Sequence, residues 1–252
     1  MIGTALVTGA TAGIGAEFAR QFAARGCSLV LVARSEGPLR ETAEELRRRW
    51  GVAVEIVIAD LLDDDGLARV QARLAQAEAP VTVLVNNAGY GLVKPFADNT
   101  LDDELRHLRI HVEIPLALAH TALVAMRPRR SGTIINVASV AGFTPRGTYG
   151  AAKAAMISFS RWANLTYGGE GVRVTAVCPG FVRTEFHQRM GVETSGIPSL
   201  LWLDPAQVVR EALRDTAAGK GVSIPSVRYR VLMAFARVVP ATIVARLAQR
   251  GR

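Results

Sequence analysis

Six short runs of the chain are apolar nearly throughout instead of alternating between apolar and polar positions. This is the pattern of strands that are buried on both faces of a sheet. The runs are TALVT (4–8), SLVLVAR (28–34), VAVEIVI (52–58), VTVLVNN (81–87), GTIINVAS (132–139) and RVTAVCP (173–179). Each predicts one strand.

The segments between these runs have helical spacing. In the first, Ile14, Phe18 and Phe22 recur every four residues, and Gly26 is expected to end the helix. The polar residues expected off this apolar face are Glu17, Arg20, Gln21 and Arg25. Repeated strand and helix predict a parallel sheet joined by right-handed crossovers.

The chain has 252 residues and contains no Pro-, Gly- or Ser-rich linker, repeat or low-complexity tract. We therefore predict one α/β domain over residues 1–252, a Rossmann-like doubly wound parallel sheet with helices on both faces. Ligands of such sheets bind beyond the carboxyl ends of the strands, which directs attention to the residues that follow each run.

The composition bears on membrane spans, signal peptides and disulfides. No run of 18 apolar residues lacks a charge, and no basic segment precedes an apolar stretch at the N-terminus, so neither a spanning helix nor a signal peptide is expected. Cys27 and Cys178 lie inside apolar runs without metal-type spacing. They are expected to be reduced core thiols of a cytoplasmic protein.

The formal net charge of +8 is concentrated in the basic C-terminal segment, about residues 219–252, which contains no Asp or Glu. Without a nucleic-acid motif, no nucleic-acid partner is expected. Helices are expected over 227–238 and 241–250, on either side of Pro240. Two alternatives stay open: contact with an anionic surface, either a bilayer or an acidic carrier of the substrate, and an arginine-fringed lid or subunit contact.

The first turn reads TGATAGIG, with Gly9, Gly13 and Gly15 between a strand and a helix. Glycines there permit a tight turn and let backbone N–H groups approach a pyrophosphate at the helix N-terminus. The spacing differs from G-x-G-x-x-G, and a glycine-rich turn can be only a turn. Its position at the start of a βαβ unit favours nucleotide binding.

The residues after the second and third strands bear on the choice of nucleotide. Arg34 and Ser35 stand where a carboxylate would bind a ribose 2′-hydroxyl and repel a 2′-phosphate, which favours NADP(H) over NAD(H). Arg34 could instead be a solvated loop cation. Asp60 closes the third strand and could accept a hydrogen bond from the adenine amino group or cap the next helix.

Tyr149 and Lys153 are four residues apart in TYGAAK, so they share one face of a helix. A neighbouring ammonium favours phenolate and lowers the pKa of a tyrosine towards the working range of an acid–base catalyst. Such a pair also recurs by chance on ordinary helices.

Together TGATAGIG, NNAG (86–89), NVAS ending at Ser139, YGAAK and PGFVRT (179–184) resemble the classical short-chain dehydrogenase/reductase family, in the family's order over about residues 3–190. The resemblance implies that Tyr149 protonates the substrate oxygen while the 4-pro-S hydride leaves the nicotinamide. It implies that Lys153 binds the nicotinamide ribose and lowers the phenol pKa, and that Ser139 hydrogen-bonds the carbonyl. The short gap between Ser139 and Tyr149 predicts a compact substrate loop.

The resemblance also assigns cofactor contacts. Asn86 is expected to help shape the cofactor floor. The implied cofactor-binding residues are Gly9, Thr11, Gly13, Ile14, Gly15, Arg34, Ser35, Asp60, Leu61, Asn87, Ala88, Gly89, Tyr149, Lys153, Pro179, Gly180, Val182 and Thr184.

One residue departs from the family pattern. The family usually has an asparagine on the helix after NNAG, where it helps to hold a water that relays protons to the lysine, and here His111 takes that place. His107 lies one turn earlier, but no third ligand is obvious and no metal is expected. We expect His111 to be a structural or relay imidazole, and we place it with the catalytic residues.

These observations predict NADPH-dependent interconversion of a ketone or aldehyde and an alcohol by a homodimer or homotetramer. The alternatives are a catalytically impaired NADP(H)-binding regulatory or scaffold protein, and an extended-type epimerase, for which the chain is short. Apolar residues after position 185 suggest a lipophilic acyl or steroid-like substrate, or ordinary packing. They are Phe186, Met190, Leu200, Leu201 and Trp202.

Overall fold

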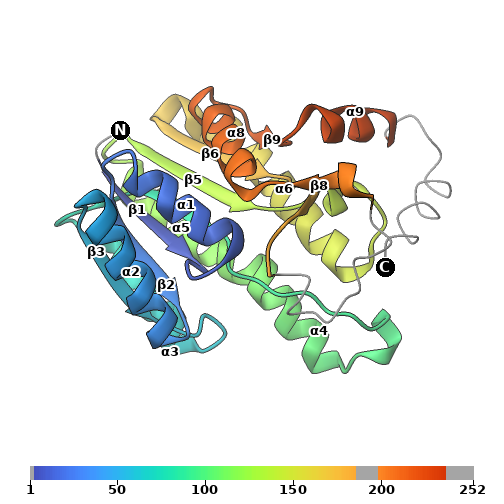
Figure 1. The fold of residues 1–252 in the computed structure, drawn as a ribbon, viewed down its shortest axis with the longest axis horizontal. Coiled ribbons are helices and arrows are strands. Elements are labelled where there is room, and N and C mark those ends of the chain that lie inside the picture. Colours follow the sequence, from blue (N-terminus) through green and yellow to red (C-terminus); the bar gives the residue numbers. More distant parts are fainter. Residues whose placement is uncertain (1–2, 186–197, 237–252) are drawn as a thin grey trace.

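A seven-stranded parallel sheet forms the centre of the protein in a computed structural model that describes residues 3–185 and 198–236 (Figure 1). Its order is β3-β2-β1-β4-β5-β6-β9, and each neighbouring pair is parallel. The strands are β1 Thr4–Thr8, β2 Ser28–Ala33, β3 Val54–Ile58, β4 Val81–Asn86, β5 Gly132–Val137, β6 Val172–Val177 and β9 Val222–Ser223. The six predicted strands are confirmed, and the two-residue β9 was not predicted.

Helices cover both faces of this sheet, as the doubly wound fold requires. The α-helices are α1 Gly13–Ala23, α2 Glu36–Trp50, α3 Asp64–Ala75, α4 Leu101–Leu108, α5 Ile114–Met126, α6 Gly147–Tyr167, α8 Pro205–Ala217 and α9 Val227–Ala236. A π-helical turn, η2 Arg109–Glu113, joins α4 to α5. Short 3₁₀ turns are η1 Phe96–Asp98, η3 Val140–Phe143, η4 Gly168–Glu170 and η5 Ser199–Leu201. A separate pair joins β7 Phe181–Val182 to β8 Trp202–Leu203.

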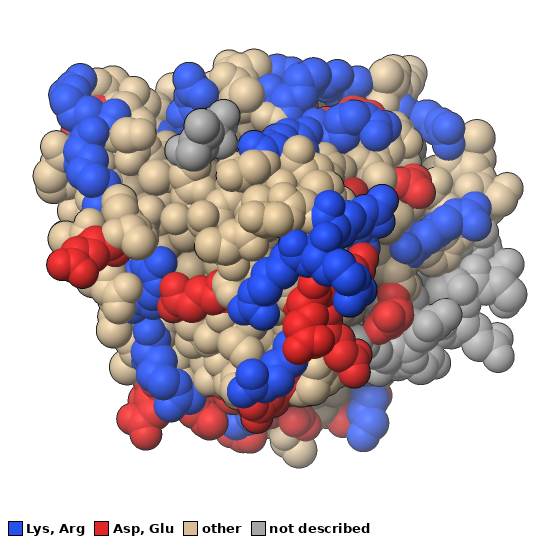
Figure 2. Space-filling view, turned by 60° about the vertical axis from the view of Figure 1, so that its left-hand side comes forward, with Lys and Arg blue, Asp and Glu red and all other residues tan. Residues whose placement is uncertain are grey.

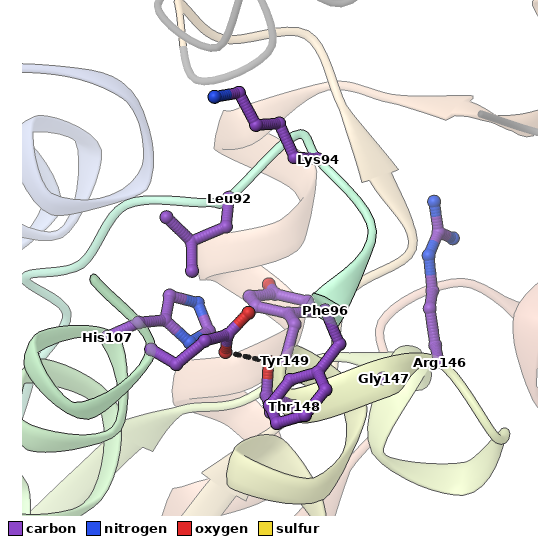
Figure 3. A pocket seen from close by; sticks show the side chains of 9 residues that line it. Leu92, Lys94, Phe96, His107, Arg146, Gly147, Thr148 and Tyr149 are labelled. Carbon is purple, nitrogen blue, oxygen red and sulfur yellow. Dashed lines mark hydrogen bonds between the residues drawn. The ribbon is translucent and has the colours of Figure 1, made fainter. Parts of the chain in front are cut away.

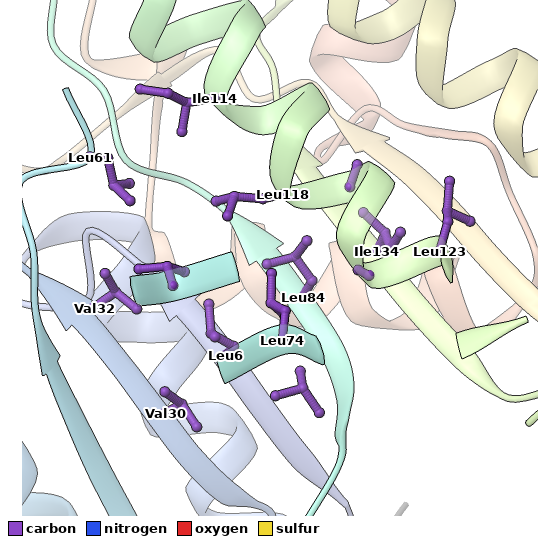
Figure 4. Packing of buried hydrophobic residues seen from close by; sticks show 14 of the residues in the cluster. Leu6, Val30, Val32, Leu61, Leu74, Leu84, Ile114, Leu118, Leu123 and Ile134 are labelled. Carbon is purple, nitrogen blue, oxygen red and sulfur yellow. The ribbon is translucent and has the colours of Figure 1, made fainter. Parts of the chain in front are cut away.

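The core consists mainly of two apolar layers, one on each face of the sheet. One packs α3, α5 and α6 onto the strands, and its fully buried members include Leu6, Leu84, Leu118 and Ile134 (Figure 4). The other packs α1, α2 and α8 onto the opposite face. Each fully buried Leu or Ile contributes about 1.5–3 kcal/mol of transfer free energy. The two layers therefore stabilise the sheet, and with it the strand ends that form the site.

The first helix follows its predicted periodicity with one exception. Phe18 and Phe22 are buried and their rings stack, with centroids 6.1 Å apart. Glu17, expected to point away from the core, is only 6% exposed and accepts a hydrogen bond from Gln21 at 2.8 Å. A buried carboxylate needs such partners, and Gln21 provides one from the next turn of the same helix.

The segment Leu101–Met126 is long and apolar enough to cross a membrane by length and composition, with a mean hydropathy of 1.3 over its most apolar window. Its second half, α5, packs against β4, β5 and α3. Leu118, Ala119, Ala122 and Met126 are buried there. These apolar residues of α5 are therefore part of the protein core.

The first part of the basic C-terminal segment packs against the rest of the protein. Helix α9 confirms the first predicted helix, and its Tyr229 and Met233 are buried. Residues 237–252, including the predicted helix 241–250, lie outside the described residues. On the face shown in Figure 2, basic side chains gather along the upper rim and mix with acidic ones below. Contact of the segment with an anionic surface stays a prediction.

Candidate active site

The glycine-rich turn between β1 and α1 has the backbone shape that a bound phosphate needs. Gly9 and Gly13 have φ of +64° and +56°, where a side chain would be strained. Ala12 occupies the N-cap of α1 and has no side chain that could accept from the helix N–H groups. The Ala12 side chain therefore accepts no hydrogen bond from the backbone N–H groups in the first turn of α1. An anionic group of the cofactor could accept from these N–H groups instead.

Gly15 has no room for a side chain. A Cβ there would lie 2.2 Å from the carbonyl oxygen of Gly9 and 2.4 Å from Nδ2 of Asn87. That amide donates to the carbonyl oxygens of Thr8 and Gly9 at 2.9 and 3.2 Å. The turn is thus tied to the end of β4, and any group at position 15 would force the two apart.

We expect Gly15→Ala to lower the free energy of unfolding by roughly 1–3 kcal/mol, because the methyl group overpacks the turn. Gly37→Ala is the matched control, since a Cβ at Gly37 meets nothing within 4 Å. That variant should be neutral or slightly stabilising on α2. Urea denaturation of both variants measures the difference, and equal stabilities would contradict the packing argument.

The residues of NNAG divide between structure and cofactor floor. Asn86 is 5% exposed and donates to the carbonyl oxygen of Pro115 at 3.1 Å and to Oδ1 of Asn136 at 2.9 Å. Its amide nitrogen therefore joins strands β4 and β5 to α5. The backbone N–H groups of Asn87 and Ala88 donate to Oγ1 of Thr8 at 2.9 and 3.1 Å. Thr8, which sequence reasoning did not single out, fixes this floor.

Two predicted residues of opposite charge lie at the ends of β2 and β3. Nη1 of Arg34 is 4.0 Å from Oδ2 of Asp60, and the Arg34 side chain is 71% exposed. Oδ1 of Asp60 accepts from the backbone N of Leu62 at 3.0 Å. The N-cap of α3 is Asp63, so Asp60 stabilises the preceding turn and does not cap the helix. Ser35 is exposed at the N-cap of α2, and Leu61 is buried.

The PGFVRT segment lies across the sheet end from the glycine turn. The carbonyl oxygen of Pro179 accepts from the N–H of Val140 at 3.0 Å. A Cβ at Gly13 would lie 3.2 Å from the Cβ of Thr184, so these two predicted contacts are neighbours. Val182 is buried in a small cluster against which Ile14 packs, while Thr11 is half-buried in the turn.

The C-terminal helix α9 holds this segment in place. The hydroxyl of Tyr229 accepts from the N–H of Phe181 at 3.1 Å and donates to the carbonyl oxygen of Leu201 at 2.8 Å. A Cβ at Gly180 would lie 1.9 Å from the Tyr229 ring. Gly180 thus allows the tyrosine to dock. This contact between distant parts of the chain has no signal in the local sequence.

Ser139, Tyr149 and Lys153 meet at the end of β5. Ser139 caps η3 by accepting from the N–H of Ala141 at 3.1 Å, and its hydroxyl lies close enough to Tyr149 to lower the pKa of the phenol. Lys153 is 7% exposed and its Nζ donates to the carbonyl oxygen of Val137 at 2.8 Å. That nitrogen lies 5.6 Å from the centroid of the Tyr149 ring. The η3 turn forms the first half of the segment VAGFTPRG (140–147), whose role as a substrate loop stays a prediction.

Burial controls the protonation of this group. It raises the pKa of Tyr149 above its ordinary value of 10.0, although the nearby Ser139 hydroxyl acts in the opposite direction. The expectation that Lys153 lowers the pKa of Tyr149 is therefore wrong for this structure. Burial also lowers the pKa of Lys153 from 10.5 to about 8. Tyr149 is thus a neutral phenol near pH 7, able to donate a proton.

His111 occupies the π-helical turn and is 3% exposed. Its Nε2 lies 2.6 Å from the carbonyl oxygen of Tyr90. A carbonyl oxygen only accepts, so Nε2 carries the proton and Nδ1 is the acceptor. Burial, then the nearby Lys153 ammonium, hold the pKa of His111 well below 6.5. A Cβ at Gly89 would lie 2.3 Å from the ring, so this glycine makes room for it.

A small pocket opens beside Tyr149 between η1, α4 and the start of α6 (Figure 3). Its lining residues are Leu92, Lys94, Phe96, Glu104, His107, Arg146, Gly147, Thr148 and Tyr149. Leu200, Leu201 and Trp202 do not line it, and Phe186 and Met190 lie outside the described residues. Sequence reasoning missed Glu104, which accepts from Asn99 at 2.7 Å and Thr148 at 2.6 Å. Within residues 3–185 and 198–236, no group of three potential ligands could hold a metal.

Comparisons with known proteins agree with this arrangement. Residues 3–194 match the family described as short chain dehydrogenase. The chain is 36% identical over 185 residues to oxidoreductase UcpA of Escherichia coli K12, covering 72% of this chain and 70% of UcpA.

Two solved structures extend the match over nearly the whole chain. A short-chain dehydrogenase from Sphingobium yanoikuyae in complex with NADPH superposes with a TM-score of 0.85 at 34% identity, covering 94% of each chain. A bulky-bulky ketone specific alcohol dehydrogenase from Comamonas testosteroni superposes with a TM-score of 0.81 at 32% identity, covering 94% of this chain and 92% of that one.

Proposed function

The chain belongs to the short-chain dehydrogenase/reductase family and is an oxidoreductase that uses NAD(P), and we propose that it interconverts a lipophilic ketone or aldehyde and the alcohol with NADPH. The observation that carries this proposal is the meeting of Ser139, Tyr149 and Lys153 beside the pocket. Leu92 and Phe96 give part of the pocket an apolar wall beside polar residues such as Lys94 and Arg146, and this apolar part supports a lipophilic group on the substrate. The Comamonas protein, a bulky-bulky ketone specific alcohol dehydrogenase, supports a ketone as the substrate.

In the reduction, NADPH supplies the hydride that adds to the carbonyl carbon. The developing negative charge falls on the substrate oxygen, where the hydroxyl groups of Ser139 and Tyr149 stabilise it. Tyr149 then gives its proton to that oxygen and becomes a phenolate. Lys153 holds its ammonium 5.6 Å from the centroid of the ring, and the phenolate then recovers a proton from solvent. The fixed backbone at Asn87, Ala88 and Pro179 would hold the cofactor.

NADPH consumption with a panel of ketones, including 3-oxoacyl thioesters and steroid ketones, tests the reaction. Turnover of a lipophilic ketone supports the proposal. Absence of turnover across the panel, with NADPH still bound, would favour the alternative of a catalytically impaired binding protein.

Arg34 is proposed to select NADPH by binding its 2′-phosphate. Arg34→Ala should weaken NADPH binding about tenfold or more, because a charge-assisted hydrogen bond is lost, and leave NADH binding unchanged. Arg40→Ala removes a similar exposed charge from α2, where Arg40 bonds Glu36 at 2.7 Å, and serves as control. Fluorescence titration with both cofactors decides the matter. Equal affinity of the wild type for NADPH and NADH would exclude this role.

His111 is proposed to take part in the proton relay through Nδ1, which accepts no hydrogen bond from the described residues. Below its pKa the imidazolium would place a second positive charge near Lys153 and remove the acceptor. Activity should therefore fall on acidification at a midpoint well below pH 6.5. His111→Asn should stay active and lose this acid limb in initial-rate pH profiles. An unchanged limb would mean that His111 only packs against Tyr90 and Tyr149.

A homodimer or homotetramer is also part of the proposal. Val124, Trp162 and Leu165 are 60%, 53% and 85% exposed on α5 and α6, and large exposed apolar side chains favour contact with another chain. None of these three residues lines the pocket.

A further inference from the structure

His107 is a buried polar residue without a described partner. Its exposed fraction is 0%, and neither Nδ1 nor Nε2 forms a hydrogen bond with the described part of the chain. Most buried polar atoms are paired, and an unpaired donor or acceptor costs about 1–3 kcal/mol. His111, one turn later, at least uses Nε2 for Tyr90. The two unpaired nitrogens of His107 therefore indicate a ligand that forms hydrogen bonds with this ring.

The imidazole lines the same pocket as the phenol of Tyr149 (Figure 3). The two ring centroids are 6.0 Å apart. His107 belongs to the pocket lining but is fully buried, so a substrate oxygen reaches its nitrogens only when a neighbouring side chain of the pocket moves aside. Leu92 and Phe96 close other sides of the pocket, and the polar residues Lys94, Arg146 and Thr148 also line it.

The surrounding residues fix the position of this ring. Thr100 caps α4 by accepting from the N–H of Asp103 at 3.1 Å. Glu104, one turn before His107, is pinned to Asn99 and Thr148 through its two carboxylate oxygens. Beyond it, the rings of His107 and His111 lie edge to face with centroids 4.6 Å apart. Glu104 thus holds the helix against α6 with both oxygens already engaged.

The neutral ring can serve both as donor and as acceptor. Burial lowers the pKa of His107 below 6.5, against the opposing influence of Glu104. Near pH 7 one nitrogen carries a proton and the other has a free lone pair. Such a group pairs well with a hydroxyl or a carbonyl oxygen, and a simple ketone has no such oxygen besides its reacting carbonyl.

We propose that His107 binds a second oxygen of the substrate, a hydroxyl or carbonyl group on the first or second carbon beyond the reacting carbonyl. The preferred substrates are then hydroxyketones and dicarbonyl compounds whose remaining surface is apolar. The proposal rests on the proposed reductase function. His107 is in this role a specificity-determining residue, since Ser139 and Tyr149 bind the reacting oxygen.

The test compares two ketones of one skeleton, 1-phenylpropan-2-one and 1-hydroxy-1-phenylpropan-2-one, in the wild type and in His107→Phe. Phenylalanine keeps an aromatic ring and removes both nitrogens. We expect the wild-type preference in kcat/KM for the hydroxylated ketone to fall roughly tenfold in the variant, mainly through KM. Comparing the variant with the wild type cancels the intrinsic reactivities. His120→Phe, at an exposed position on α5, should leave the preference unchanged.

The outcomes distinguish a failure of the His107 assignment from a failure of the reductase proposal. An unchanged preference in a folded His107→Phe that still reduces both ketones overturns the assignment of His107. Absence of turnover of both ketones by the wild type and across the wider ketone panel overturns the reductase proposal itself. Should His107→Phe fail to fold, the ¹⁵N resonances of the wild-type histidines are followed while the hydroxylated ketone is added with NADP⁺ present. A shift of the His107 signal supports the contact, and a constant signal overturns it.

Discussion

Replacing Tyr149 by phenylalanine is expected to lower kcat for carbonyl reduction by about 10²–10⁴-fold, the usual contribution of a positioned general acid. The phenol is neutral near pH 7 because burial raises its pKa, and the Ser139 hydroxyl lies beside it. Without it, hydride addition leaves the alkoxide with the Ser139 hydroxyl as donor and without a proton from the enzyme. Initial rates at saturating NADPH measure the loss.

NADPH binding should change little in Tyr149→Phe, since the ring that packs against His111 is retained, with centroids 5.6 Å apart. Tyr167→Phe removes a hydroxyl from the far end of the same helix, α6, and should keep full activity. If wild type and Tyr149→Phe reduce a ketone at the same rate, Tyr149 is not the acid. If both are inert and both bind NADPH, the protein is a cofactor-binding module.

The fold could be predicted because its strands are encoded locally. Uninterrupted apolar runs such as those of β1, β2 and β4 have few alternatives to a sheet covered on both faces. The glycine turn and the Tyr149–Lys153 pair were recognisable because their function requires fixed spacings within one turn. In contrast, β9 has two residues, and its pairing with β6 depends on the preceding helix and loop.

The parts of the site that sequence reasoning missed depend on contacts between distant elements. Tyr229 docks onto Gly180 from α9, and Thr8 orders the backbone after β4. The free nitrogens of His107 are visible only when its neighbours are placed. The pKa of Tyr149 was predicted in the wrong direction, because spacing shows the nearby cation but not the amount of protein that buries the phenol.

Lys153 should impose an alkaline limb on the enzyme. Burial lowers its pKa from 10.5 to about 8, so the ammonium is lost as the pH rises through about 8. The pKa of Cys178 is raised to about 12 and that of Tyr149 lies above 10.0, so neither neighbour titrates in this range. The ratio kcat/KM for NADPH reports groups of the free enzyme, and it should decline above pH 8.

Lys153→Met should lower kcat/KM for NADPH by roughly tenfold to a hundredfold, because the hydrogen bonds of a charged donor are lost, and it should remove the alkaline limb.

The same substitution should leave the stability of the protein unchanged or increase it. An unfolded lysine keeps its proton between pH 8 and 10.5 while the folded one releases it, so the buried charge costs stability below pH 8. An apolar side chain of similar length avoids this cost, although the carbonyl of Val137 loses its donor. Thermal melting and initial-rate profiles together separate the outcomes. A variant that loses activity while its melting temperature holds or rises identifies Lys153 as a residue retained for catalysis at the expense of stability. A variant that melts earlier and keeps the alkaline limb would show that Lys153 serves mainly to pack α6 against β5.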